Sequence, residues 1–309
     1  MLIRGNNFLS VSIRVNPWQL FLSVAKFFYP MTEKLLILGG TREAYDLAEC
    51  LVEQFSPEQL TVITSLAGVT ENPKLPAGEV RIGGFAETYG TVGKSGRNRI
   101  LGLQKYLLQE KITLLVNATH PFAIRISENA LAAATELGLP YLRLTRPPWL
   151  KHSGDQWIEV PDLAAAADYL KSEFLDTNSG QSKQIVFLTT GNRGLELFQQ
   201  CRNYNFVVRT VELPQSIESA TGNSVWEQAE FLQARGPFSL EHELALFRQH
   251  GISLLVSKNS GGDSTYAKIE AARKLDIPVL MVARPEVNYA DLCLQVDQVL
   301  DWIVQHKST

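Results

Sequence analysis

The sequence predicts an α/β protein whose sheets are mainly parallel and carry helices on both faces. From Lys34 onward, short apolar runs alternate with segments of helical periodicity, which is the pattern of successive β–α–β units. Polar, often glycine-rich segments follow several of these runs, as expected where a strand turns toward a helix. The chain has 309 residues, and at about 150 residues per domain this length corresponds to roughly two domains.

Composition narrows the class of protein further. The chain is 45% hydrophobic and 20% charged, which suits a full hydrophobic core and excludes a disordered protein. The net charge of −3 gives no global basic field, so we expect no nucleic-acid partner. Three cysteines (Cys50, Cys201 and Cys293) lie far apart, and the five histidines show no ligand spacing. We therefore expect a reducing, cytoplasmic compartment and no metal site.

Residues 1–33 do not match the pattern of the rest of the chain. An apolar stretch between Pro17 and Pro30 follows two arginines, as in a signal peptide, but Lys26 interrupts it and no small-residue cleavage site follows. The stretch is too short for a transmembrane helix, so we expect no membrane partner. Met31 leads straight into the first predicted strand. We expect residues 1–33 to be a disordered extension or the result of a misassigned start.

The first predicted unit spans residues 34–149. Its strands are short apolar runs, and its helices carry apolar residues at helical spacing. Thr41 is a suitable N-cap for the first helix, and Gly138 ends the last one. In chain order we predict strand Leu35–Leu38, helix Arg42–Gln54, strands Leu60–Thr64 and Val80–Ile82, helix Ile100–Gln109, strand Ile112–Asn117, helix Phe122–Leu137 and strand Tyr141–Leu144.

The second predicted unit spans residues 150–309. The segment Arg146-Pro147-Pro148-Trp149 separates the units, because two prolines continue neither a strand nor a helix. After it we predict helix Leu163–Lys171, strand Ile185–Leu188, a helix after Gly194, strand Phe206–Arg209, helices near Trp226–Gln233 and at Leu240–Gln249, strand Ile252–Val256, helix Thr265–Leu275, strand Val279–Val282 and helix Tyr289–Gln305.

The turn after the first strand is a candidate phosphate-binding turn. Glycines there let backbone N–H groups approach a pyrophosphate, and the following helix N-terminus favours an anion. The residues concerned are Gly39, Gly40, Thr41, Glu43 and Ala44. The full GxGxxG fingerprint is absent, so a plain tight turn stays an alternative.

The second strand ends in hydroxyl side chains. Thr64 and Ser65 stand where an NAD-binding fold commonly carries an acidic residue on the ribose. Their neutral side chains suit the 2′-phosphate of NADP, which a carboxylate would repel. The alternative is a loop that binds nothing.

Two further strand ends of the first unit carry candidate residues. Thr119, His120 and Pro121 follow a buried strand, and Thr119 and Pro121 are candidate cofactor-binding residues. His120 is the candidate catalytic residue, with a structural histidine as the alternative. Arg143 and Arg146 lie beside an aromatic residue at the junction of the units. Their charge suits the carboxylates of a flat ligand, and the alternative is that both are solvated or ion-paired.

Candidate substrate residues also follow strands of the second unit. Arg193 stands in a glycine-rich loop after one strand. Another strand leads into a segment of small polar residues with a fixed positive charge, and a further lysine lies just beyond it. These residues are Lys258, Asn259, Ser260, Gly261 and Lys268. Because all these positions are strand ends, we expect them to face one crevice.

Five motifs occur in an order that resembles the precorrin-6A reductase family of cobalamin (vitamin B12) biosynthesis, which includes cobalt-precorrin-6A reductases. They are Leu36–Ala44, Thr64–Gly68, Arg81–Phe85, Ala118–Ala123 and Lys258–Gly262. The resemblance implies two Rossmann-like lobes with a ligand crevice between them. It also implies NADPH as hydride donor and a tetrapyrrole substrate rich in carboxylates, one ring double bond of which is reduced. It adds Gly83 and Gly84 to the cofactor side.

The sequence departs from this family at three places. Val69 stands where many members have an arginine, Asn117 stands where a strand usually ends in aspartate, and Glu87–Arg99 has the character of an insertion. A non-catalytic NADP-binding sensor or regulatory subunit is the rival interpretation. The arginines and lysines at the strand ends would have no role in a sensor. We expect a monomer or a small homo-oligomer.

Overall fold

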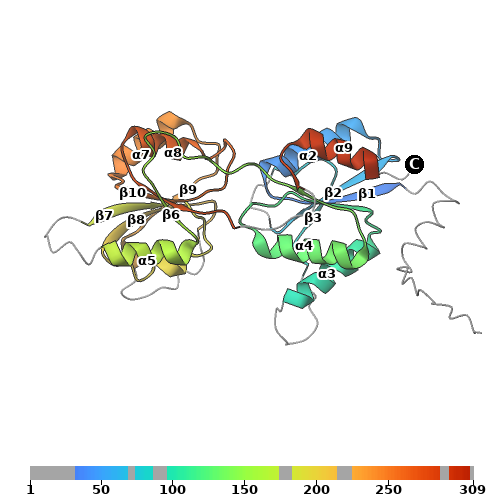
Figure 1. Cartoon of the computed structure of the whole chain (residues 1–309), viewed down its shortest axis with the longest axis horizontal. Helices are drawn as coiled ribbons and strands as arrows, with labels where there is room; N and C mark the ends of the chain where they lie inside the picture. Colours follow the sequence, from blue (N-terminus) through green and yellow to red (C-terminus); the bar gives the residue numbers. More distant parts are fainter. Residues whose placement is uncertain are drawn as a thin grey trace, which may run out of the picture.

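The computed structural model describes residues 32–68, 74–85, 96–173, 183–213, 225–285 and 292–306. Within these residues the chain forms two six-stranded sheets in which every pair of neighbouring strands is parallel. Each sheet has helices on both faces (Figure 1). The predicted α/β class, with mainly parallel sheets, is therefore confirmed.

The first sheet has the strand order β12-β5-β4-β1-β2-β3. Its strands are β1 (Glu33–Leu38), β2 (Leu60–Leu66), β3 (Glu79–Ile82), β4 (Leu114–Asn117), β5 (Tyr141–Leu144) and β12 (Leu292–Cys293). Two helices cover one face, α2 (Arg42–Gln54) and α9 (Val296–His306), and two cover the other, α3 (Gly96–Gln109) and α4 (Ile124–Leu137). The four inner strands are buried on both faces and are therefore nearly continuous apolar runs, whereas the edge strands β3 and β12 are partly exposed.

The second sheet has the strand order β6-β11-β10-β7-β8-β9. Its strands are β6 (Trp157–Val160), β7 (Gln184–Leu188), β8 (Tyr204–Thr210), β9 (Glu230–Gln233), β10 (Leu254–Lys258) and β11 (Val279–Val282). Helix α5 (Leu163–Glu173) covers one face, and α7 (Leu240–His250) and α8 (Ala267–Lys274) cover the other. Two 3₁₀ turns, Leu195–Phe198 and Val225–Gln228, add apolar side chains to the α5 side.

Each sheet reverses its strand order once. In the first sheet the chain runs from β1 outward to β3 and then returns to place β4 on the other side of β1. In the second sheet β7 and β10 are the corresponding neighbours. Ligands of open parallel sheets bind outside the carboxyl ends of the strands at such a reversal. The fold therefore offers one position for a ligand in each lobe, where a lobe is one sheet with the helices that cover it.

Several predicted elements differ from the observed ones. The helix predicted near Trp226–Gln233 is a 3₁₀ turn followed by the edge strand β9, and the helix after Gly194 is a single 3₁₀ turn. Strands β6 and β12 were not predicted. Edge strands of two to four residues carry too few side chains for their period to be read from sequence.

The C-terminal segment joins the first sheet. Strand β12 pairs with β5, and α9 lies beside α2 (Figure 1) with Val299, Trp302 and Ile303 in the core of the first lobe. The end of the predicted 150–309 unit therefore belongs to the first sheet and not to the second. The sequence did not indicate this, because an amphipathic pattern does not say which sheet a helix covers. The division near residue 150 otherwise stays a prediction.

Some predictions concern residues outside the described part. Residues 1–31, Val69, most of the Glu87–Arg99 segment and the start of the Tyr289–Gln305 helix fall there. Among the described residues, no helix has both the length and the hydropathy needed to cross a membrane.

Candidate functional site

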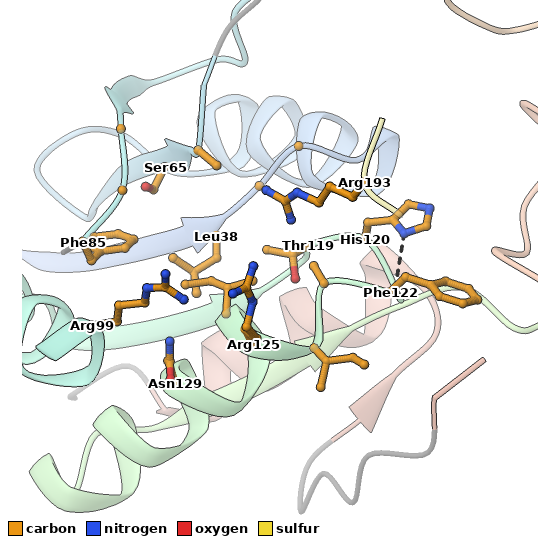
Figure 2. Close-up of a pocket in the computed structure, with 18 residues that line it drawn as sticks. Leu38, Ser65, Phe85, Arg99, Thr119, His120, Phe122, Arg125, Asn129 and Arg193 are labelled. Atoms are coloured by element: carbon orange, nitrogen blue, oxygen red, sulfur yellow. Dashed lines mark hydrogen bonds between the residues drawn. The ribbon is translucent and has the colours of Figure 1, made fainter. Parts of the chain in front are cut away.

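A cavity of about 560 Å³ lies at the carboxyl ends of β1 and β4, where the first sheet reverses its strand order (Figure 2). It is lined by Leu38, Gly39, Gly40, Ser65, Ala67, Gly83, Gly84, Phe85, Arg99, Thr119, His120, Phe122, Ala123, Ile124, Arg125, Ile126, Asn129 and Arg193. All but Arg193 belong to the first lobe. The cavity occupies the position that strand topology predicts for a ligand.

The turn after β1 is shaped by close contacts to neighbouring strands. The Gly39 N–H donates to the Ser65 carbonyl at 2.9 Å, and a Cβ at Gly39 would lie 2.8 Å from Thr64 Cγ2. Thr41 caps α2 by accepting from the Ala44 N–H, and its hydroxyl donates to the Ala118 carbonyl at 2.7 Å. This second bond ties the start of α2 to the end of β4. Glycine and threonine are therefore needed here by the geometry of the turn.

Three glycines leave open space at the cavity. A Cβ at Gly40, Gly83 or Gly84 would meet no atom within 4 Å, and Gly40 and Gly83 have φ values of +106° and +119°. The backbone can therefore approach a ligand closely at these points. Arg81 holds the backbone of Gly83 and Gly84 in place, because its guanidinium donates to their carbonyl oxygens at 2.6 and 2.7 Å.

Arg81 is thus occupied by protein contacts. Its guanidinium also donates to the Ser65 hydroxyl at 3.2 Å and stacks 3.9 Å above the Phe85 ring. Burial lowers the pKa of Arg81 from its ordinary value. Arg81 therefore shapes the wall of the cavity formed by β2 and β3.

The cavity carries positive charge and no acidic lining residue. Arg99 comes from α3, Arg125 from the first turn of α4 and Arg193 from the loop after β7. Among the residues that the structure describes, none of these three arginines has a hydrogen-bonded or ion-paired protein partner. Unpaired cations in a concave site favour an anionic ligand with several charges.

His120 is neutral in this setting. Burial, and then the charges of Arg146, Lys258, Arg284 and Lys268, lower its pKa from 6.5 to about 3. Its Nδ1 accepts the Phe122 N–H at 3.2 Å, which leaves Nε2 as the protonated ring nitrogen. His120 can therefore donate one hydrogen bond through Nε2, and it is not an imidazolium acid near neutral pH.

Arg143, predicted on the substrate side, is only 1% exposed. Its Nη1 donates to the Asn117 carbonyl and side-chain oxygens at 2.9 and 2.6 Å, and its Nη2 donates to the Thr119 carbonyl at 2.8 Å. These bonds hold the chain that leads from β4 into the cavity wall. Direct contact with a substrate is at odds with this burial, so we assign Arg143 a positioning role.

The segment Asn259–Gly261, also predicted on the substrate side, holds the crossing segment Arg146–Trp149, which connects the two lobes. Asn259 exchanges two hydrogen bonds with the Trp149 backbone, at 2.8 and 3.0 Å. The Ser260 carbonyl accepts from Arg146 at 2.8 Å and from Arg284 at 2.9 Å. The predicted anion-binding segment is therefore a joint between the second lobe and the crossing segment.

Arg146 and the two lysines have distinct surroundings. Arg146 forms an ion pair with Glu43 at 2.8 Å, which links the crossing to the start of α2. The Lys258 ammonium donates to the Thr190 carbonyl at 2.6 Å and lies 5.7 Å from the Phe122 ring centre. Lys268 is 4% exposed above the Trp149 ring, and burial lowers its pKa to about 7. Lys258 therefore lies beside Phe122, which lines the cavity.

The structure thus brings together part of the predicted site. The cavity lining includes the predicted residues Gly39, Gly40, Ser65, Gly83, Gly84, Thr119, His120 and Arg193. The predicted cofactor residues that do not line the cavity are Thr41, Glu43, Ala44, Thr64 and Pro121. Arg99 and Arg125 were missed, because they project from helices and no strand-end pattern marks them.

Comparison with known proteins gives a consistent result. The model of the family described as "Precorrin-6x reductase CbiJ/CobK" matches residues 34–304. The chain is 39% identical over 252 residues to a precorrin-6A reductase of Rhodococcus erythropolis, covering 82% of this chain and 89% of that one. It is 34% identical over 276 residues to a precorrin-6A reductase of Rhodobacter capsulatus, covering 89% and 98%. A solved structure of CobK precorrin-6A reductase matches with TM-score 0.73 and 35% identity over 90% of this chain and 98% of that one.

Proposed function

Since the chain belongs to the precorrin-6x reductase CbiJ/CobK family, it is an enzyme of precorrin-6A reduction in cobalamin biosynthesis, and we propose that NADPH, bound in the first lobe, is its hydride donor. The observation that carries the cofactor proposal is the acid-free cavity with three unpaired arginines among the described residues. NADPH carries three phosphate groups, two in the pyrophosphate and one on the ribose. The strand-end position of the cavity is the usual one for a dinucleotide.

The residues of the cavity fit such a ligand along its length. Gly39 and Gly40 give the pyrophosphate access to the backbone at the start of α2. Ser65, at the end of β2, lies on the ribose side, where no carboxylate repels a 2′-phosphate. His120 and Phe122 form the far wall, toward the second lobe. When bound, the reduced nicotinamide supplies the hydride.

The protein then contributes orientation and charge. His120 can hold a carbonyl or carboxylate through its Nε2–H without changing protonation state. Negative charge arriving at a conjugated macrocycle spreads through the ring, so a strong acid is not obligatory. Lys258 offers a cation for the substrate's carboxylates on the second-lobe side. We assign the substrate side to Lys258 and the adjoining face of the crevice, in place of the buried Arg143.

NADPH should bind more tightly than NADH, by about 1–3 kcal/mol, from charge-assisted contacts to the additional phosphate. Fluorescence titration of the purified chain with each cofactor measures this difference. The decay of NADPH absorbance with metal-free and with cobalt-loaded precorrin-6A tests the reaction and identifies the preferred substrate. Equal affinities for the two cofactors would contradict the NADPH assignment, and absence of decay with both substrates would contradict the activity.

Replacing His120 by alanine should slow turnover by less than about 100-fold, the lower end of the range for loss of a general acid. The wild-type pH profile should show no break near 6.5, because the native pKa is about 3. Single-turnover kinetics across pH measure both. A loss of about a thousandfold, with disappearance of a break near the ordinary histidine pKa, would instead identify an obligate proton donor.

The same pKa predicts a stability effect of defined sign. Below pH 6.5 the unfolded chain protonates His120 while the folded chain does not, so acid favours unfolding down to about pH 3. Wild type should therefore lose more stability than His120→Gln as pH falls through this window. Equal losses in the two proteins would show that His120 is not held neutral.

A further inference from the structure

We propose that Arg193, carried by the second lobe, binds the pyrophosphate of the dinucleotide that the first lobe holds. The inference rests on the proposed function and reassigns Arg193 from the substrate side to the cofactor. Under this inference, residues of both lobes contribute to the cofactor site. Three features of the described residues support it: a fixed loop, an unpaired guanidinium, and the place where that guanidinium enters the cavity.

The loop that carries Arg193 is anchored on both sides within the second lobe. The Asn192 side chain donates to the Glu212 carbonyl at 2.9 Å, and the Gly194 N–H donates to Glu196 Oε2 at 3.1 Å. The next turn buries Leu195 and Phe198 in the core of the lobe. These contacts fix the backbone, so the exposed Arg193 side chain is the part of the loop that points away from its own lobe.

The Arg193 side chain points into the cavity of the other lobe. It lines the same cavity as Leu38, Gly39 and Gly40, and Figure 2 shows its guanidinium directed toward the centre of the cavity, as is that of Arg125. No acidic residue of the described chain pairs with it. Burial, and then the charge of Arg193, lower the pKa of Lys258, so the two cations repel one another.

The position along the cavity distinguishes the pyrophosphate from the other anions. The Gly39–Gly40 turn and the start of α2 are the phosphate-binding part of the first β–α unit. Ser65 and Phe85, on the β2–β3 side, mark the ribose 2′-phosphate end, where Arg99 is the available cation. Lys258 faces Phe122 on the substrate side. Arg193 enters between these two ends, over the glycine turn.

The test compares NADPH with 2′-AMP, which keeps the 2′-phosphate and lacks the pyrophosphate. Calorimetric or fluorescence titration of the full chain gives the dissociation constants for wild type, Arg193→Ala and Arg193→Lys. Arg202→Ala is the matched control, because it removes an exposed arginine of the same lobe that does not line the cavity. KM for precorrin-6A at saturating NADPH is measured in parallel.

Arg193→Ala should weaken NADPH binding by about 10- to 100-fold, as expected for a lost charge-assisted phosphate contact. Arg193→Lys should restore part of the NADPH affinity. The affinity of Arg193→Ala for 2′-AMP should change by less than about twofold, and Arg202→Ala should change the affinities for NADPH and for 2′-AMP by no more than that. Unchanged NADPH affinity in Arg193→Ala would overturn the inference, and a rise in the precorrin-6A KM alone would return Arg193 to the substrate. Failure of wild type to bind NADPH would instead contradict the proposed function.

Discussion

Replacing Arg143 by methionine should lower the free energy of unfolding by about 2–4 kcal/mol, because it leaves several buried acceptors without donors. The acceptors are the Asn117 side chain and the carbonyl oxygens of Asn117 and Thr119, all at the end of β4. Since these residues lead into the cavity wall, NADPH affinity should fall together with stability. Chemical denaturation and cofactor titration of the same variant measure the two effects.

Arg42→Met is the matched control for this prediction. The Arg42 side chain is 71% exposed and, within the described part of the chain, its ion-pair partner is the exposed Asp46, so its loss should change stability by less than about 0.5 kcal/mol. Arg143→Lys should give an intermediate loss, because an ammonium can supply some of the missing donors. If Arg143→Met kept wild-type stability and NADPH affinity but raised KM for precorrin-6A, Arg143 would contact the substrate after all.

Replacing Gly261 by alanine should disrupt the joint between the lobes. Gly261 has φ +68°, and a Cβ there would lie 2.0 Å from the Pro147 carbonyl oxygen, so the crossing segment must move. We expect a stability loss of about 2–4 kcal/mol from the strained backbone and the overpacking together. Turnover should fall by about 100-fold, because a displacement of about 1 Å between reacting groups has an effect of this size.

Gly251→Ala separates the steric effect from the backbone effect. Gly251 ends α7 with φ +60°, and its nearest contact for a Cβ is an ordinary 3.7 Å to Ile185. It should therefore lose only the backbone part of the stability, about 1–2 kcal/mol, and keep wild-type turnover. Thermal unfolding and steady-state kinetics of both variants make the comparison. Equal behaviour of the two would show that the joint does not set the geometry of the lobes.

Much of the cavity lining could be predicted because it depends on local sequence. The Gly39–Gly40 turn, Ser65 and His120 each follow a buried apolar run, and parallel strands bring their carboxyl ends to one edge. Strand pairing of this kind needs no knowledge of side-chain packing. The roles of the charged residues were predicted less well. The sequence of an arginine that follows a strand is the same whether its side chain is buried, ion-paired or free.

The sequence by itself determined the α/β class, the alternation of elements and the strand ends that line the cavity, because these follow from the period of apolar residues and from glycine's conformational freedom. Only the tertiary structure decided that Arg143 is enclosed, that Asn259 binds the crossing segment and that α9 returns to the first sheet. It also decided that Arg193 lines the cavity of the other lobe. Each of these facts depends on contacts between residues far apart in the chain, which local periodicity does not encode.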